Sequence, residues 1–210
     1  MSATATPPAP YPSTTPPAAG PGPRPWKWSR EDYYRLGELG FFDGKRVELI
    51  YGEIVEMSPI NIAHANGVGL VTDALTLVFA IGYHLRSQQP FWIPGCELGT
   101  EPEPDVSVVP GARRDYTDHP TVAALIVEVA DSTFFYDTTT KAELYATANV
   151  ADYWVLDLNS RQLHVFRDPQ PLPQGLGATA YRTRLVLGPA DSVPPLAAPH
   201  AAVRVADLLP

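Results

Sequence analysis

The stretch AALIVEVADSTFFYDTTTKAELYATANVADYWVLDL, residues 123–158, decides the fold. Its first eight residues are almost all apolar, which is typical of a central strand that is buried on both faces. A helix is predicted from about Thr138 to Ala148, with Asp137 as its N-cap. Residues 153–158 then return to the pattern of a strand. The stretch therefore predicts a strand, a helix and a second strand around one core.

Further elements are predicted on both sides of this stretch. One helix is expected from the capping residue Ser29 to near Gly40, and a longer one from Ile62 to Tyr83. A β-hairpin is expected over residues 47–57, around Tyr51-Gly52. Other strands are expected at residues 91–98, 105–109, 162–167 and 181–188. The fold class is therefore α/β or α+β, with a mixed central sheet flanked by helices.

Composition separates the chain into two parts. It has 210 residues, of which 45% are hydrophobic, enough for one folded core. Residues 1–25 are mostly Pro, Ala, Thr and Gly, so we expect a disordered tail, or else a polyproline docking segment, ahead of a domain spanning residues 26–210. The single cysteine, Cys96, excludes an internal disulfide framework and a paired-cysteine metal site.

Hydropathy and charge argue against a secreted protein, a membrane protein and a broad nucleic-acid binder. The N-terminus lacks the basic and apolar regions of a signal peptide, and no run of about 18 apolar residues occurs. A soluble, cytoplasmic protein is therefore expected. The net charge of −8 argues against a broad, non-specific nucleic-acid binder. It is compatible with a nuclease, because carboxylates that bind a metal add negative charge that the cation offsets.

Two carboxylates occur where the core pattern does not favour them. Asp105 opens a strand just after Pro104, and Glu128 interrupts the apolar run LIVEVA. A carboxylate in a central strand is costly unless it is paired or bound to a metal. The alternative is a buried or strand-end acid that accepts hydrogen bonds from backbone donors.

Lys141 is one of only three lysines in the chain. On its predicted helix it shares a face with Leu144, Tyr145 and Ala148, which directs it toward the core and calls for a negative partner. The alternatives are a lysine that extends to solvent and a simple pair with Asp137. If the lysine instead meets the two acids, the three residues supply hard oxygen ligands for Mg²⁺ and a cation for a phosphate.

The same residues carry a resemblance to a known family. Pro104-Asp105, the segment 126–158, and VELIYGEIVEMSP (residues 47–59) followed by His64 resemble the Uma-two type of restriction endonuclease, within the PD-(D/E)XK nuclease superfamily. The resemblance covers roughly residues 26–209. It implies a restriction-endonuclease-like core and Mg²⁺- or Mn²⁺-dependent hydrolysis of phosphodiester bonds in DNA.

The resemblance also implies roles for single residues. Asp105 and Glu128 match the metal-ligand acids, with the Val129 carbonyl as a backbone ligand, and Lys141 matches the active-site lysine. Glu48 and His64 match an accessory acid and a histidine that faces the site. The superfamily places its lysine two residues after the second acid, where this chain has Ala130, so the resemblance implies that Lys141 takes that place from the following helix.

Other assignments stay open at this point. Arg113 and Arg114, just after the Asp105 strand, are candidates for contacts with phosphates. The leading hypothesis is a Mg²⁺-dependent DNA endonuclease, which the resemblance suggests acts as a homodimer. The second is a catalytically inactive nuclease fold that binds DNA or a protein partner, which the acidic charge favours. The third is a glycosidase with two acids, which the lysine on an apolar face disfavours.

Overall fold

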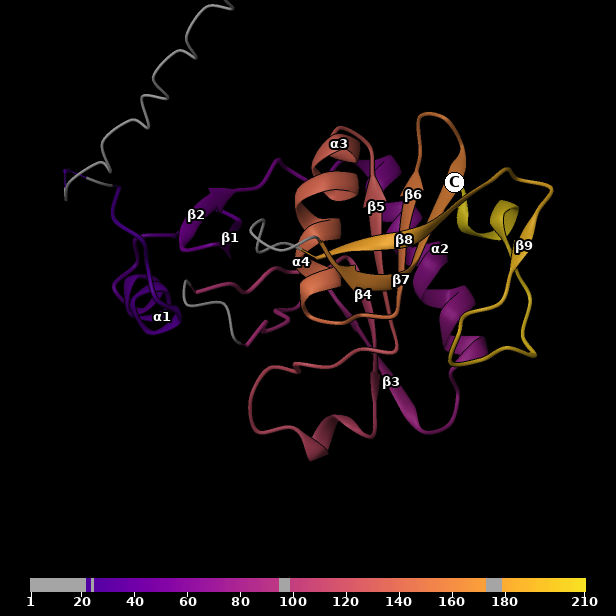
Figure 1. Ribbon diagram of the computed structural model, residues 1–210, viewed down its shortest axis with the longest axis horizontal. Coiled ribbons are helices and arrows are strands. Elements are labelled where there is room, and N and C mark those ends of the chain that lie inside the picture. Colours follow the sequence, from indigo (N-terminus) through magenta and orange to yellow (C-terminus); the bar gives the residue numbers. More distant parts are fainter. Residues whose placement is uncertain (1–21, 24, 95–98, 173–178) are drawn as a thin grey trace, which may run out of the picture.

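The computed structural model describes residues 22–23, 25–94, 99–172 and 179–210. Its centre is a six-stranded sheet in the order β3-β4-β5-β6-β7-β8 (Figure 1). The two middle strands, β5 (Leu125–Ala130) and β6 (Asp152–Asp157), pair in parallel, and every other neighbouring pair is antiparallel. The predicted mixed sheet is therefore confirmed, with the apolar run of residues 125–130 at its middle.

The other elements surround these two strands. The sheet is completed by β3 (Tyr83–Ser87), β4 (Val106–Pro110), β7 (Gln162–Pro171) and β8 (Thr179–Leu187). Two short hairpins stand apart from it, β1 (Val47–Ile50) with β2 (Glu53–Glu56), and β9 (Ser192–Val193) with β10 (Val203–Arg204). The helices are α1 (Arg30–Glu38), α2 (Ile62–Val78), α3 (Phe134–Tyr136) and α4 (Ala142–Thr147), with a π-helical segment η2 (Asp137–Lys141) and 3₁₀ turns η1 (Arg113–Asp115) and η3 (Val205–Leu208).

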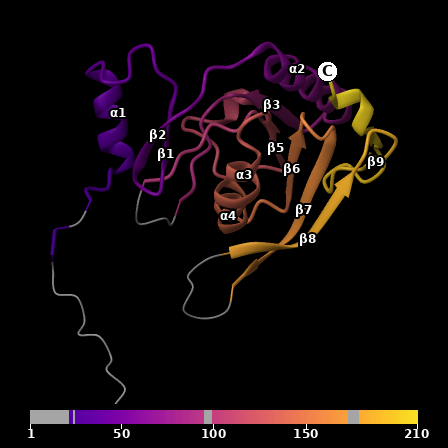
Figure 2. The same ribbon diagram turned by 90° about the horizontal axis from the view of Figure 1, so that it is seen from above.

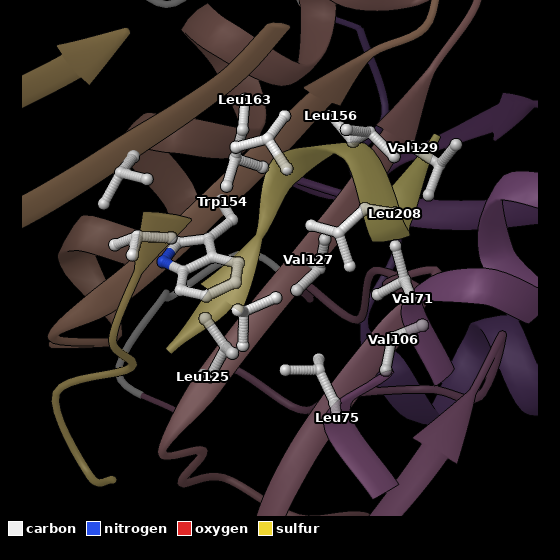
Figure 3. Packing of buried hydrophobic residues seen from close by; sticks show 14 of the residues in the cluster. Val71, Leu75, Val106, Leu125, Val127, Val129, Trp154, Leu156, Leu163 and Leu208 are labelled. Carbon is white, nitrogen blue, oxygen red and sulfur yellow. The ribbon is translucent and has the colours of Figure 1, made fainter. Parts of the chain in front are cut away.

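Helices cover the sheet on both faces. Seen from above, α2 lies on one side of the sheet and α3 with α4 on the other, while α1 and the β1–β2 hairpin extend beyond one end (Figure 2). The α2 side packs Val71 and Leu75 against Val127 and Trp154 (Figure 3). The opposite side packs Tyr145 and its neighbours in a second apolar cluster. Burial of both faces explains why the middle strands are apolar throughout.

Alternation along β5 decides which residues reach the site. Val127 and Val129 point into the α2-side cluster, whereas Ile126 and Ala130 point into the cluster beneath α4. Successive side chains of a strand face opposite sides of its sheet. Glu128 has the parity of Ile126 and Ala130, so it faces α4 from the centre of the sheet.

Several predicted elements are confirmed. Helix α1 begins at a complete capping box between Ser29 and Asp32, and the hairpin turns at Tyr51-Gly52. The strands predicted at residues 153–158, 162–167 and 181–188 correspond to β6, β7 and β8.

Two predictions in the middle of the chain are wrong. The helix expected to reach Tyr83 ends at Val78, because the chain reverses at Gly82, whose φ is +80°, and Tyr83 opens the unforeseen strand β3. Residues 91–94 do not form the expected strand, and residues 95–98 lie outside the described residues. Of the expected tail, residues 1–21 and 24 also lie outside them.

Asp137 does not cap a helix. The helical path begins earlier, at Phe134, and passes through the π-helical turn before α4 starts. The Asp137 backbone N–H already donates to the Thr133 carbonyl at 2.9 Å, and its side chain accepts from the Thr133 hydroxyl. Its carboxylate is thereby free of a capping role and is buried toward the interior. Within the described ranges, no helix is long and apolar enough to cross a membrane.

Candidate active site

Two neighbouring strands bring the two acids together. Asp105 directly precedes β4, and the pairing of Val106 with Val127 places it beside Glu128 in β5. The Asp105 backbone N–H donates to Glu128 Oε2 at 3.2 Å, and the Val129 N–H donates to Asp105 Oδ2 at 2.8 Å. Both side chains are buried, Glu128 to 2% exposure. The acids therefore form one hydrogen-bonded unit in the sheet.

Lys141 reaches this unit from the helical side. Its ammonium donates to Glu128 Oε1 at 3.0 Å and to Glu48 Oε1 at 3.1 Å, and the side chain is 2% exposed. The Tyr145 hydroxyl also donates to Glu128 Oε1, at 2.8 Å. The π-helical turn ends at Lys141, which directs this residue and Tyr145, four residues later, at the same carboxylate. The lysine expected to lie on the apolar face is thus buried and paired.

Glu48 and His64 complete the cluster. Glu48 lies in β1, and its Oε2 atom is buried without a hydrogen-bond partner among the described residues. His64 lies in the first turn of α2, with Nε2 3.0 Å from Asp105 Oδ1. The Val129 carbonyl is a further hydrogen-bond partner of the His64 ring. All the residues singled out around the two acids and Lys141 therefore meet at one place.

The charges of the cluster depend on one another. Burial raises the pKa of the Glu128 carboxyl well above its ordinary value, although Lys141 opposes this. Burial alone would lower the pKa of Lys141, but Glu128 and Glu48 reverse that effect and the net pKa is raised, so the ammonium stays charged. Burial also favours the neutral form of Asp105, yet the hydrogen bond and charge of His64 hold its pKa below the usual value.

The cluster forms the floor of an open pocket. The lining residues are Arg46, Glu48, Met57, Ser58, Pro59, Ile60, Asn61, His64, Glu103, Asp105, Glu128, Asp131, Ser132, Thr133, Asp137 and Lys141. Six of these side chains are acidic, and three are lysine, arginine or histidine. Burial raises the pKa of Asp137 to about 6, with Lys141 and Thr133 opposing. The pocket thus holds more acids than cations and favours a further positive charge.

Asp137 and Asn61 also line the pocket, although neither was among the predicted site residues. Asp137 lines it rather than capping a helix, and its position four residues before Lys141 in the sequence suggests only a pair with that lysine. Asn61 precedes the apolar run of α2, which is typical of an N-cap. Its Oδ1 accepts from the His64 N–H at 2.9 Å, while its Nδ2 donates to Asp131 across the pocket.

The two arginines proposed for phosphate contacts do not reach this pocket. Arg113 and Arg114 lie in η1, beyond the far end of β4, and neither lines the pocket that holds Asp105. A guanidinium nitrogen of Arg113 donates instead to the Leu85 carbonyl. Arg46, which was not singled out from the sequence, is the arginine at the pocket.

Comparison with known families identifies the family of the chain. A family model described as "Uma2: Putative restriction endonuclease" matches residues 30–203, nearly the whole of the described chain. The chain belongs to this family. The matched range includes every residue of the cluster, from Glu48 to Lys141.

A solved structure supports the fold of this Uma2 chain. A crystal structure described as a "putative nuclease belonging to DUF820", from Anabaena variabilis ATCC 29413, has a TM-score of 0.64 and 16% sequence identity. The similarity covers 85% of this chain and 95% of that one. No curated protein matches the chain. Family and fold together support a nuclease.

The donor set of the Uma2 site suits a hard divalent cation. Buried carboxylates and the nearby Val129 carbonyl are oxygen ligands of the kind that Mg²⁺ and Mn²⁺ prefer, and Glu48 Oε2 has no hydrogen-bond partner among the described residues. Among the described residues, however, no three or more His, Cys, Asp or Glu side chains stand in an arrangement ready to hold a metal. Both oxygens of Asp105 and of Glu128 accept protein hydrogen bonds. Binding of a cation therefore requires at least one of these bonds to be exchanged.

Proposed function

We propose that this Uma2 chain is a DNA endonuclease that depends on Mg²⁺ or Mn²⁺. The observation that carries the proposal is the meeting of Asp105, Glu128 and a charged Lys141 on the floor of one pocket. An acid pair with a lysine is the set that hydrolysis of a phosphodiester needs, because it offers metal ligands and a cation for the phosphate. The family name supports restriction-type cleavage of DNA.

Each residue has a distinct part in this proposal. Asp105 and Glu128 would hold the cation, with the Val129 carbonyl as a further oxygen ligand. A bound divalent cation would polarise the scissile phosphate and favour ionisation of a water molecule. Lys141 keeps its positive charge at the bottom of the pocket, where it can stabilise the charge that develops on the phosphate or orient the attacking water.

His64 and Glu48 act on the ligands. His64 contacts Asp105 Oδ1, so the imidazole and a cation compete for the same oxygen. The second oxygen of Glu48 has no hydrogen-bond partner among the described residues, so it is available to accept a hydrogen bond from a water molecule in the pocket. Glu48 also pairs with Lys141 from the side opposite Glu128, which fixes the position of the ammonium. Both residues therefore tune the site from beside the two ligands.

Cleavage of supercoiled plasmid tests the proposal. We expect cleavage with Mg²⁺ or Mn²⁺ and none with EDTA. Asp105→Asn, which keeps the shape of the side chain, and Lys141→Ala should each lower the rate by about 100-fold or more, the size of effect seen when a group that stabilises a transition state is removed. Asp73→Asn, on the exposed side of α2, should cleave like the wild type. Circular dichroism confirms that each variant is folded.

The outcomes test the assignment of the site residues and the proposed function separately. Unchanged cleavage in both Asp105→Asn and Lys141→Ala would contradict the site assignment. The second candidate, an inactive nuclease fold that binds DNA or a partner, is favoured by the protein hydrogen bonds on both ligand acids and by the net charge of −8. Calorimetry that detects no binding of Mg²⁺ or Mn²⁺, together with no cleavage, would support that candidate instead.

A further inference from the structure

Two arginines meet at the exposed edge of the sheet, away from the active-site pocket. Arg86 lies in β3, the outermost strand on that side (Figure 1), and Arg113 lies in η1. Both line one hollow, whose other lining residues are Tyr116, Thr117, Asp118 and His119. We call this set the edge hollow.

The fold holds both guanidinium groups in place. Arg113 donates to the Leu85 carbonyl on the open edge of β3. The nearby turn is fixed by a bond from the Gly111 N–H to the Gly82 carbonyl at 2.8 Å. An Nη2 of Arg86 lies 3.2 Å from His119 Nδ1, which makes that nitrogen an acceptor. The two cations are therefore positioned by a backbone carbonyl and by a ring nitrogen of His119.

No carboxylate of the described chain neutralises either arginine. Arg86 and Arg113 form no salt bridge within the described ranges. Other cations of the chain do, for example Lys27 with Glu53 and Arg167 with Asp152. The one acid of the hollow, Asp118, is occupied by Arg30, which donates to its two oxygens at 2.5 and 3.1 Å. Burial, and then the charge of Arg113, lower the pKa of Arg86. In a chain with a net charge of −8, two uncompensated cations held together favour an anion.

Position relates the edge hollow to the proposed active site. Arg86 pairs with Ser107 of β4, two residues after Asp105, which directly precedes that strand. Side chains two residues apart on a strand share a face, about 7 Å apart along it. Two residues beyond Arg86, the Gln88 amide donates to Asp105 Oδ1 at 3.3 Å. The edge hollow and the active-site pocket are therefore close to each other along β3 and β4.

We propose that the edge hollow binds a backbone phosphate of the DNA strand whose scissile phosphate lies at Asp105. This proposal rests on the proposed function for its ligand. Two guanidinium groups can share the oxygens of one phosphate, and such contacts fix the register of a nucleic acid without reading its sequence. They also give an acidic protein a local attraction for DNA that its net charge does not provide.

Binding of a fluorescent DNA duplex, measured by anisotropy in Ca²⁺ without cleavage, tests this site. We expect the double variant Arg86→Gln, Arg113→Gln to bind about 10-fold more weakly at moderate salt. The slope of log affinity against log salt should fall by about one, because the two arginines share a single phosphate. The control is Arg114→Gln, an exposed arginine next to Arg113 that does not line the hollow and should bind like the wild type. Arg86→Lys, with its charge retained, should keep most of the affinity.

Two results would overturn the proposal. One is equal affinity and salt slope in the wild type and the double variant. The other is an equal loss in Arg114→Gln, which would mean a diffuse effect of charge. A third arm measures the melting temperature with inorganic phosphate. If phosphate raises this temperature in the wild type but not in the double variant, and the double variant binds DNA like the wild type, the hollow binds a free oxyanion. The DNA assignment is then wrong. Failure of the wild type to cleave in Mg²⁺ leaves this binding test intact, so the two proposals can fail separately.

Discussion

At the scale of single residues, the decisive contact is the buried pairing of Lys141 with Glu48 and Glu128. All three side chains are at most 2% exposed. Removing one partner from a buried ion cluster leaves an uncompensated charge in a low dielectric, which costs far more than the pair itself contributes. The site residues are therefore expected to matter for stability as well as for chemistry.

Replacement of Lys141 by Met tests this. The loss of the ammonium should lower the free energy of unfolding at pH 7 by about 3–5 kcal/mol, the range for a broken buried pair. Lys27→Met is the matched control, because the Lys27–Glu53 pair is exposed and such pairs contribute about 0–1 kcal/mol. Urea unfolding of both variants measures the difference. Equal losses would mean that Lys141 is not held as a charged partner.

His164, which lies outside the pocket, should make the stability of the fold depend on pH. It is 6% exposed, its Nδ1 accepts from Arg184 at 2.9 Å, and its Nε2 is buried without a partner in the described chain. Burial, followed by Arg184, lowers its pKa below the ordinary 6.5, with Asp157 opposing. A histidine with a lowered pKa is neutral in the fold, so the unfolded chain binds the proton first and stability falls as the pH drops below 6.5.

His164→Gln should remove that component. The unfolding free energy of the variant should fall less than that of the wild type between pH 7.5 and pH 5, even if the variant is weaker at pH 7.5. Chemical denaturation at both pH values gives the comparison. Parallel pH profiles would show that His164 does not titrate in this range.

At the scale of elements, the close approach of α2 to β5 places His64 over the acids. A Cβ atom on Gly67 would lie 2.9 Å from Val129 Cγ1, so only glycine fits without movement. Gly69, on the same helix, has nothing within 4 Å of such an atom. The two glycines separate the effect of packing from that of helix propensity.

Alanine at these two positions should act in opposite directions. Gly69→Ala should stabilise the protein by about 0.5–1 kcal/mol, since alanine favours the helix. Gly67→Ala gains the same propensity but must displace a buried valine, at a cost of about 1–3 kcal/mol, and should be destabilising overall. Thermal or urea unfolding measures both. A stabilising Gly67→Ala would mean that α2 can move away from β5 freely.

Elements with a strong local pattern were predictable from the sequence. The apolar run of β5 indicates a buried strand, and the capping box of α1 indicates the start of a helix, each from a few consecutive residues. The strand β3, with the polar sequence YHLRS, lacks such a pattern, because an edge strand beside the buried β4 needs few apolar side chains. The π-helical turn before Lys141 has no signature in composition, so Asp137 was assigned to a cap.

At the scale of the whole molecule, the contacts that make the site join distant parts of the chain. Lys141 meets Glu48 across 93 positions of sequence. Asp105, Glu128 and Lys141 could be singled out because charged residues do not fit the apolar core pattern. No local sequence pattern predicts where the β1–β2 hairpin lies relative to them. The resemblance to the Uma2 family supplied Glu48 and His64. The separation of Arg113 from Arg114 required the three-dimensional arrangement, because the two are equivalent in sequence.

The proposed binding of a metal in this acidic pocket would also affect the stability of the whole fold. A ligand that binds only the folded chain stabilises it by RT ln(1 + [L]/Kd), about 2.7 kcal/mol at 100 times Kd. For a domain of this size that raises the melting temperature by about 5–10 °C. We expect Mg²⁺ or Mn²⁺ to have this effect on the wild type, beyond that of NaCl at equal ionic strength.

Two variants identify where the cation acts. Asp105→Asn removes the charge of a proposed ligand and should abolish the metal-dependent rise in melting temperature, whereas Asp73→Asn, on the exposed side of α2, should retain it. His64→Ala removes the shorter of the two hydrogen bonds to Asp105 Oδ1 and leaves the one from Gln88, so the rise should begin at a lower metal concentration. Differential scanning fluorimetry over a metal titration measures all three. An equal rise in the wild type and Asp105→Asn would place the cation outside this pocket. An unshifted titration in His64→Ala would mean that the imidazole and the metal do not compete for the same oxygen.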